Sequence, residues 1–150
     1  MASADFIGKS RGTPLATAVG TPPMCRVLFV SHDADLCAVA ARIIADIGHE
    51  VTTAAHAGHA TLACAKGDFD VLVIENQMPD ESGRAIIDRI RRYCPGVQVV
   101  RLCDPVSTIV GGGIAVVRPF TADDLLDAVI ESAANAALVV PYMRRGATTR

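Results

Sequence analysis

Short apolar runs alternate with amphipathic segments over most of the chain. Most of the runs are rich in Val, Ile and Leu and contain few polar residues, which is typical of strands buried on both faces of a parallel sheet. We predict five strands, at residues 26–30, 51–55, 70–74, 97–102 and 114–117.

Helical periodicity occupies the segments between these runs. The first helix can be capped by Asp33 or Asp35 and ends at Gly48. A weaker helix spans 57–65, and a third ends at Cys94-Pro95-Gly96. Each of these helices has apolar positions that are expected to face the core of the domain. They are Leu36, Val39, Ala40, Ile43, Ile44, Ile47, Leu62, Ile86, Ile87 and Ile90.

The last helix begins at Thr121, with Asp124 three residues later in a near capping box. Its predicted buried face consists of Leu125, Leu126, Val129 and Ile130. Strands that alternate with helices predict an α/β domain with a parallel sheet and right-handed crossovers.

Functional groups of such a sheet gather outside the carboxyl ends of its strands. The residues that follow the predicted strands are therefore the candidates for chemistry. They are Ser31-His32-Asp33, Glu75-Asn76, Cys103-Asp104 and Arg118-Pro119-Phe120.

Composition restricts the domain organisation and the partners. The chain has 150 residues, 51% of them hydrophobic, which suits one domain with a full core. We predict a flexible leader over 1–24, the domain over 25–135 and a tail over 136–150. The net charge of -2 argues against a basic nucleic-acid-binding surface.

Five cysteines are present, an odd number without a CxxC motif: Cys25, Cys37, Cys64, Cys94 and Cys103. This pattern argues against a disulfide framework or a zinc site and predicts reduced thiols in the cytoplasm. No apolar run approaches the ~20 residues of a membrane span, so we expect no membrane association.

Three stretches resemble the receiver domain of two-component response regulators: VLFVSHDADL, DVLVIENQMPDESG and VVRPF, at 27–36, 70–83 and 116–120. The most specific feature is Met78-Pro79 with Gly83, followed at the right distance by Arg-Pro-Phe. The resemblance extends from Arg26 to about Ala134. It implies a flavodoxin-like, doubly wound five-stranded parallel sheet of order 2-1-3-4-5.

The interval from Cys103 to Arg118 is shorter than in the family by roughly two helical turns. This interval contains Gly111, Gly112 and Gly113. We therefore expect the fourth helix of the family to be shortened or absent.

Receivers accept a phosphoryl group on an Asp, with Mg²⁺ held by two acidic residues. A hydroxyl residue and a Lys bind the phosphoryl group, and a Tyr in the fifth strand responds. The resemblance places Ser31 and His32 at the acidic pair, Glu75 at the Asp, Cys103 at the hydroxyl, Arg118 at the Lys and Ala115 at the Tyr.

These substitutions change the chemistry of the site. Mg²⁺ requires hard oxygen ligands, whereas Ser31 and His32 offer a neutral hydroxyl and a nitrogen. We therefore expect no metal and no cofactor. Glu75 and Arg118 balance in charge, and we predict that they form an ion pair through the bidentate guanidinium fork.

The leading hypothesis is a non-enzymatic pseudo-receiver in two-component (phosphorelay) signal transduction, acting through phosphorylation-independent protein–protein interaction. Its partner would be a histidine kinase, a phosphotransfer protein or another regulator, and a homodimer is a further option. One alternative is a phospho-accepting receiver in which Glu75 is the acceptor or Asp33 restores metal binding. A small nucleotide- or flavin-binding enzyme is another, although the first strand is followed by SHDAD and not by a glycine loop.

Overall fold

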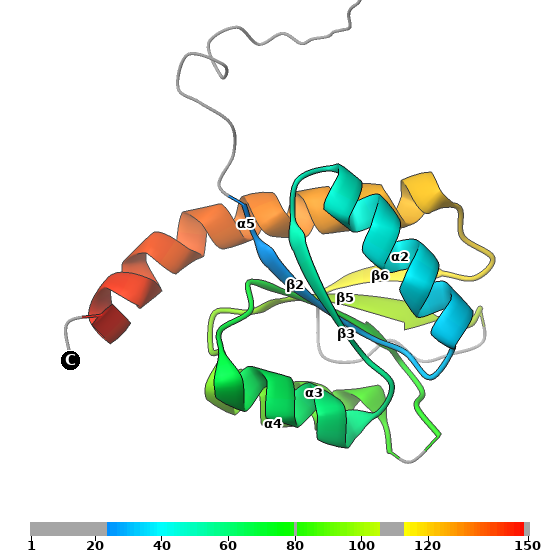
Figure 1. The fold of residues 1–150 in the computed structure, drawn as a ribbon, viewed down its shortest axis with the longest axis horizontal. Coiled ribbons are helices and arrows are strands. Elements are labelled where there is room, and N and C mark those ends of the chain that lie inside the picture. The colour runs from blue at the N-terminus through cyan, green and yellow to red at the C-terminus, as the bar shows by residue number, and fades with distance from the viewer. Residues whose placement is uncertain (1–23, 80, 106–112, 149–150) are drawn as a thin grey trace, which may run out of the picture.

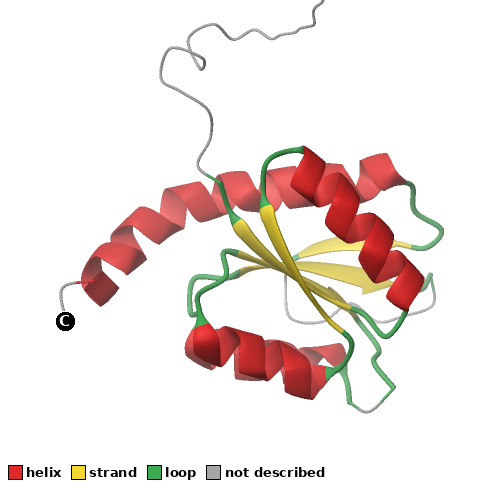
Figure 2. Ribbon diagram, viewed as in Figure 1, coloured by secondary structure: helices red, strands yellow, loops and turns green. Residues whose placement is uncertain are grey.

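The structure, a computed structural model, describes residues 24–79, 81–105 and 113–148. Strands and helices alternate over residues 26–103, as predicted (Figure 2). In chain order they are β2 (Arg26–Val30), α2 (Ala34–Asp46), β3 (Glu50–Ala54), α3 (Ala57–Lys66), β4 (Val71–Glu75), α4 (Gly83–Tyr93), β5 (Gln98–Cys103), β6 (Ile114–Val117) and α5 (Ala122–Thr148).

The five strands form one parallel sheet in the order β3-β2-β4-β5-β6. In sequence order of the strands this is 2-1-3-4-5, which confirms the predicted doubly wound, flavodoxin-like sheet. Every residue of the central strand β4 is buried. The carboxyl end of β4 therefore lies between those of β2 and β5, and a side chain there is surrounded by protein.

Helices cover both faces of the sheet, with α2 and α5 on one face and α3 and α4 on the other (Figure 1). Alternation along each strand divides the core into two clusters. The cluster under α2 and α5 includes Val27, Phe29, Val71, Val73, Val100 and Leu102. The cluster under α3 and α4 includes Leu28, Val30, Leu72, Ile74, Ile86 and Ile90.

Four apolar positions that were predicted to face the core are exposed: Val39, Ile47, Leu62 and Ile130. Small side chains occupy much of the buried stripe on these helices. The buried stripe is narrower than the predicted apolar face, so apolar residues at its margin are exposed to solvent. The small residues of these stripes are Cys37, Ala40, Ala57, Ala60, Cys64, Ala128 and Ala133.

Both predicted caps have side-chain partners. Asp33, and not Asp35, caps α2, since its Oδ1 accepts a hydrogen bond from the backbone N–H of Leu36 at 3.1 Å. At the start of α5 the backbone N–H of Thr121 donates to Asp124 Oδ2 at 2.9 Å, and the Thr121 hydroxyl accepts from the N–H of Asp124 at 3.1 Å. This reciprocal pair confirms the capping box.

The segment from Ala136, predicted as a tail, continues α5 to Thr148. In Figure 1 this end of the helix projects beyond the sheet. The predicted loss of the fourth helix concerns residues 106–112, and the predicted leader concerns 1–23; both segments lie outside the described residues. No helix in the described part of the chain is long and apolar enough to cross a membrane.

Candidate functional site

The site is organised around Glu75, the last residue of β4. Its side chain is only 7% exposed, although it lies at the edge of the sheet where ligands bind in this fold. Ser31 follows β2, and Arg118 follows β6. The topology therefore brings three of the predicted site residues together from segments that are far apart in sequence.

Glu75 has partners on both carboxylate oxygens. Arg118 Nη2 donates to Oε1 at 2.7 Å, which confirms the predicted pair. The Ser31 hydroxyl donates to Oε2 at 2.5 Å, and Nδ1 of His32 lies 3.1 Å from the same oxygen. The expected bidentate fork is therefore wrong: one guanidinium nitrogen holds one oxygen, because Ser31 and His32 hold the other.

Ser31 is fully buried and connects the carboxylate to the start of α2. Its hydroxyl oxygen accepts a hydrogen bond from the backbone N–H of Asp33 at 3.0 Å while its proton is directed at Glu75. Its own N–H donates to the carbonyl of Ala54 at 3.1 Å. The hydroxyl is thus fixed by both β3 and α2, and its orientation toward Glu75 is set by the backbone.

Arg118 is fixed at both ends. Its backbone N–H donates to the carbonyl of Cys103 at 2.8 Å, which extends the pairing of β6 with β5. Its guanidinium carbon lies 5.5 Å from the centroid of the Phe120 ring, within range of a cation–π contact. The side chain is 32% exposed, so the ion pair has a buried acid and a partly hydrated base.

The loop after β4 folds back closely on the site. Gly83 donates its N–H to the carbonyl of Asn76 at 3.0 Å. A Cβ atom at Gly83 would lie 2.5 Å from the carbonyl oxygen of Glu75, too close for any other residue without movement of the backbone. Glycine is therefore required here for steric reasons, and its absence would displace the backbone that carries the central carboxylate.

Cys103 and Ala115 are the residues that the resemblance matches to the hydroxyl residue and the Tyr of receiver domains. Cys103 is fully buried at the end of β5. Burial, followed by the nearby Asp104, raises the pKa of its thiol, so the side chain is a neutral, weak hydrogen-bond donor. Ala115 lies in β6 and has no ring that could rotate.

Arg101 also belongs to this region, and the sequence pattern did not identify it. Arg101, in β5, is 1% exposed, and its Nη1 donates to Asn76 Oδ1 at 3.3 Å. Burial is the main cause that lowers its pKa, and Arg91 and Arg84 act in the same direction. An arginine within the apolar run VVRL could have indicated a buried charge beside the site.

The donor set does not fit Mg²⁺. Both oxygens of Glu75 already have protein partners, and Ser31 directs its proton, not a lone pair, at that carboxylate. Asp33, considered as a replacement ligand, uses Oδ1 to cap α2. Within the described ranges no three His, Cys, Asp or Glu residues are grouped so as to hold a metal ion.

Proteins of known class resemble this chain in sequence. It is 30% identical to the transcriptional regulatory protein TcrA of Mycobacterium tuberculosis over 115 residues, which cover 72% of this chain and 46% of TcrA. It is also 30% identical over 74 residues to the DNA-binding transcriptional regulator NtrC of Azospirillum brasilense, covering 49% of this chain and 15% of NtrC. No protein-family model matches the chain.

Solved structures share the fold. A response regulator receiver domain from Clostridium thermocellum superposes with a TM-score of 0.70 at 21% identity, covering 77% of this chain and 99% of that one. The receiver domain of the hybrid histidine kinase CckA superposes with a TM-score of 0.64 at 25% identity, covering 72% and 98%.

Fold and sequence similarity together match this chain to the receiver domains of two-component response regulators. It spans less than half of TcrA, since the aligned region covers 46% of that protein.

Proposed function

We propose that this receiver is a non-enzymatic signalling module whose protein interactions do not depend on phosphorylation. The supporting observation is the engagement of both oxygens of Glu75 by Arg118, Ser31 and His32. The resemblance places the phosphoryl-accepting carboxylate at this residue. An oxygen that is held by a guanidinium or by a hydroxyl proton is a poor nucleophile, because attack would first require those contacts to break.

The charge balance of the site supports the same proposal. Phosphoryl transfer depends on positive charge that neutralises the oxygens of the transferred group, and a divalent metal usually supplies it. Here the positive charge of Arg118 is already paired with Glu75 at 2.7 Å. A phosphoryl group brought to this site would have to displace Glu75 from Arg118, so we expect neither acceptance nor tight binding.

The interaction surface that we propose consists of β6 and the outer side of α5. Val117 and Ile130 are exposed large apolar residues on these two elements. A histidine kinase, a phosphotransfer protein, another regulator or a second copy of the chain would dock there. We place this function in the cytoplasm, where the five free cysteines would stay reduced.

Treatment with acetyl phosphate or carbamoyl phosphate and Mg²⁺, followed by intact mass measurement, tests the proposal. We expect no gain of a phosphoryl group, while a receiver with the usual Asp, Lys and acidic pair gains one under the same conditions. A gain that Glu75→Gln abolishes would establish Glu75 as an acceptor and contradict the proposal. Calorimetric titration with Mg²⁺ should show millimolar or weaker binding, by the ligand argument above.

A further inference from the structure

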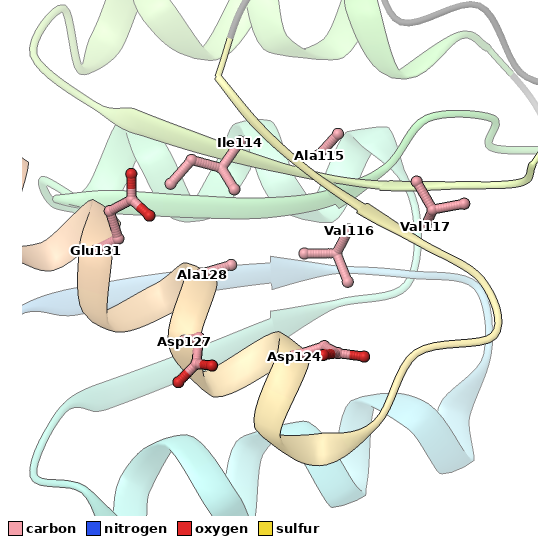
Figure 3. Close-up of a pocket in the computed structure, with 8 residues that line it drawn as sticks. All are labelled: Ile114, Ala115, Val116, Val117, Asp124, Asp127, Ala128 and Glu131. Atoms are coloured by element: carbon pink, nitrogen blue, oxygen red, sulfur yellow. The ribbon is translucent and has the colours of Figure 1, made fainter.

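A groove runs between the edge strand β6 and helix α5 (Figure 3). It encloses about 280 Å³. Strand β6 and one small helical residue form its apolar part, and acidic residues of α5 form the remainder. The apolar lining residues are Ile114, Ala115, Val116, Val117 and Ala128, and the acidic ones are Asp124, Asp127 and Glu131. Glu131 lies near the Ile114 end of the strand and Asp124 near the Val117 end (Figure 3).

The acidic side carries negative charge that no described residue balances. Asp127 and Glu131 are exposed and stand four residues apart on α5, a spacing at which like charges repel each other. Among the residues described, no cation lies within ion-pair distance of either. Asp124 differs, because one of its oxygens caps the helix through the N–H of Thr121. Two carboxylates are therefore available to a ligand.

The strand offers a second set of binding groups. β6 is the last strand of the sheet, and no described strand pairs with its outer edge. The N–H of Arg118 points inward to Cys103, and backbone groups alternate in direction along a strand. Ala115 and Val117 therefore direct their N–H and C=O groups outward, as a template for another strand.

We propose that this groove binds an extended cationic segment of a protein partner, which pairs with the outer edge of β6 and places Lys or Arg side chains against Asp127 and Glu131. The inference rests on the proposed function, because it names the chemistry of the partner at the same surface. The edge supplies backbone hydrogen bonds, and the acidic side selects the charge of the bound segment.

The spacing of the two carboxylates determines the pattern of the ligand. Four helical residues advance about 6 Å along the axis of α5. Alternate residues of a strand, which point to the same face, stand about 6.7 Å apart. Basic residues at positions i and i+2 therefore match Asp127 and Glu131. The intervening residues point to the opposite face of the sheet, beside the exposed Val117, and should be apolar.

A fluorescent synthetic peptide of alternating Lys and Val, added to the full chain, provides the test by anisotropy. We expect binding that weakens as salt is added. The double variant Asp127→Asn/Glu131→Gln should bind about tenfold more weakly, as expected for the loss of two exposed charge pairs. The matched control Asp35→Asn/Asp46→Asn removes two exposed acids from α2 and should leave the affinity unchanged.

Two further peptides separate strand pairing from simple charge attraction. A peptide of the same composition with all lysines at one end should bind several-fold more weakly. A peptide whose backbone nitrogens are methylated along one edge should lose binding if that edge faces β6. The amide resonances of Ala115 and Val117 in the protein should shift only with peptides that bind. Equal affinity for the permuted peptide, or for the Asp127→Asn/Glu131→Gln variant, would overturn the proposal.

The same assay distinguishes this inference from the proposed function. Binding that appears only after acetyl phosphate treatment, with a phosphoryl group seen by mass, would contradict phosphorylation independence and leave the groove assignment intact. Absence of binding before and after treatment, with an unchanged mass, would overturn the groove assignment alone.

Discussion

Replacing Glu75 with Gln tests the central contact of the site. The substitution keeps the volume of the side chain and removes its charge. Glu75 is 7% exposed and is approached by Arg118 at 2.7 Å, by the Ser31 hydroxyl and by His32. All three neighbours favour a carboxylate. The amide group of Gln would direct N–H toward one of these partners and leave a donor facing a donor.

The size of the effect follows from burial. A hydrogen bond to a charged group contributes about 1.5–3 kcal/mol. Gln keeps one acceptor oxygen, and Arg118, at 32% exposure, recovers part of its hydration. We therefore expect Glu75→Gln to lower the free energy of unfolding by about 1–3 kcal/mol. A partly exposed pair would contribute only about 0.5–1 kcal/mol.

Urea denaturation gives this free energy, and Glu50→Gln is the matched control. Glu50 pairs with Arg26 at 3.0 Å, but the two side chains are 54% and 38% exposed. The control should therefore cost less than about 0.5 kcal/mol. If Glu75→Gln were no more destabilising than Glu50→Gln, the buried pair would add nothing to stability and the reasoning from burial would be refuted.

Three other substitutions test single features of the fold by urea denaturation. Gly83→Ala should cost about 1–3 kcal/mol, because its methyl group would meet the carbonyl of Glu75; an unchanged midpoint would show that the loop relaxes freely. Nδ1 of His49 accepts a hydrogen bond from the N–H of Cys25, and burial lowers the pKa of His49. Below about pH 6.5 the unfolded state therefore binds more protons than the folded state, and the free energy of unfolding should fall as the pH is lowered. His49→Asn keeps an acceptor and should reduce this loss of stability at low pH. If the variant and the unsubstituted protein had the same pH profile of stability, the prediction would be contradicted. Thr121→Ala should cost about 1 kcal/mol by removing the cap of α5, and a cost near zero would show that the capping box is not needed.

The fold could be predicted because its signals are local. Apolar runs marked the strands to within about one residue, and Asp33 and Thr121 marked helix starts through side-chain caps. The exposure of Val39 and Ile130 could not be predicted, because it depends on how much of each helix the neighbouring elements cover. Periodicity gives the direction of a buried face but not its width.

The contacts of Glu75 could be predicted only in part. Glu75 and Arg118 could be paired because both follow strands of the same sheet. The role of Ser31 could not be derived, since its hydroxyl is oriented by backbone contacts with Ala54 and Asp33. Arg101 was missed because a single charge in an apolar run carries little weight in a pattern read by hydrophobicity.

The remaining question is whether the charge of Glu75 reaches the β6–α5 groove. In the family, as the resemblance implies, the signal passes from the phosphoryl group through a hydroxyl after β5 to an aromatic ring in β6. Here Cys103 is a buried thiol with a raised pKa, and Ala115 has no ring. Cys103 is a weak hydrogen-bond donor and Ala115 has no side-chain rotamers, so we predict a single dominant conformation. Glu75→Gln should then lower stability and leave the affinity of the groove for the alternating Lys–Val peptide within about twofold. A tenfold loss of affinity in protein that is still folded would mean a coupling of about 1.4 kcal/mol between the two sites. Glu75 would then act as a constant substitute for a phosphoryl group, and the uncoupled description would be wrong.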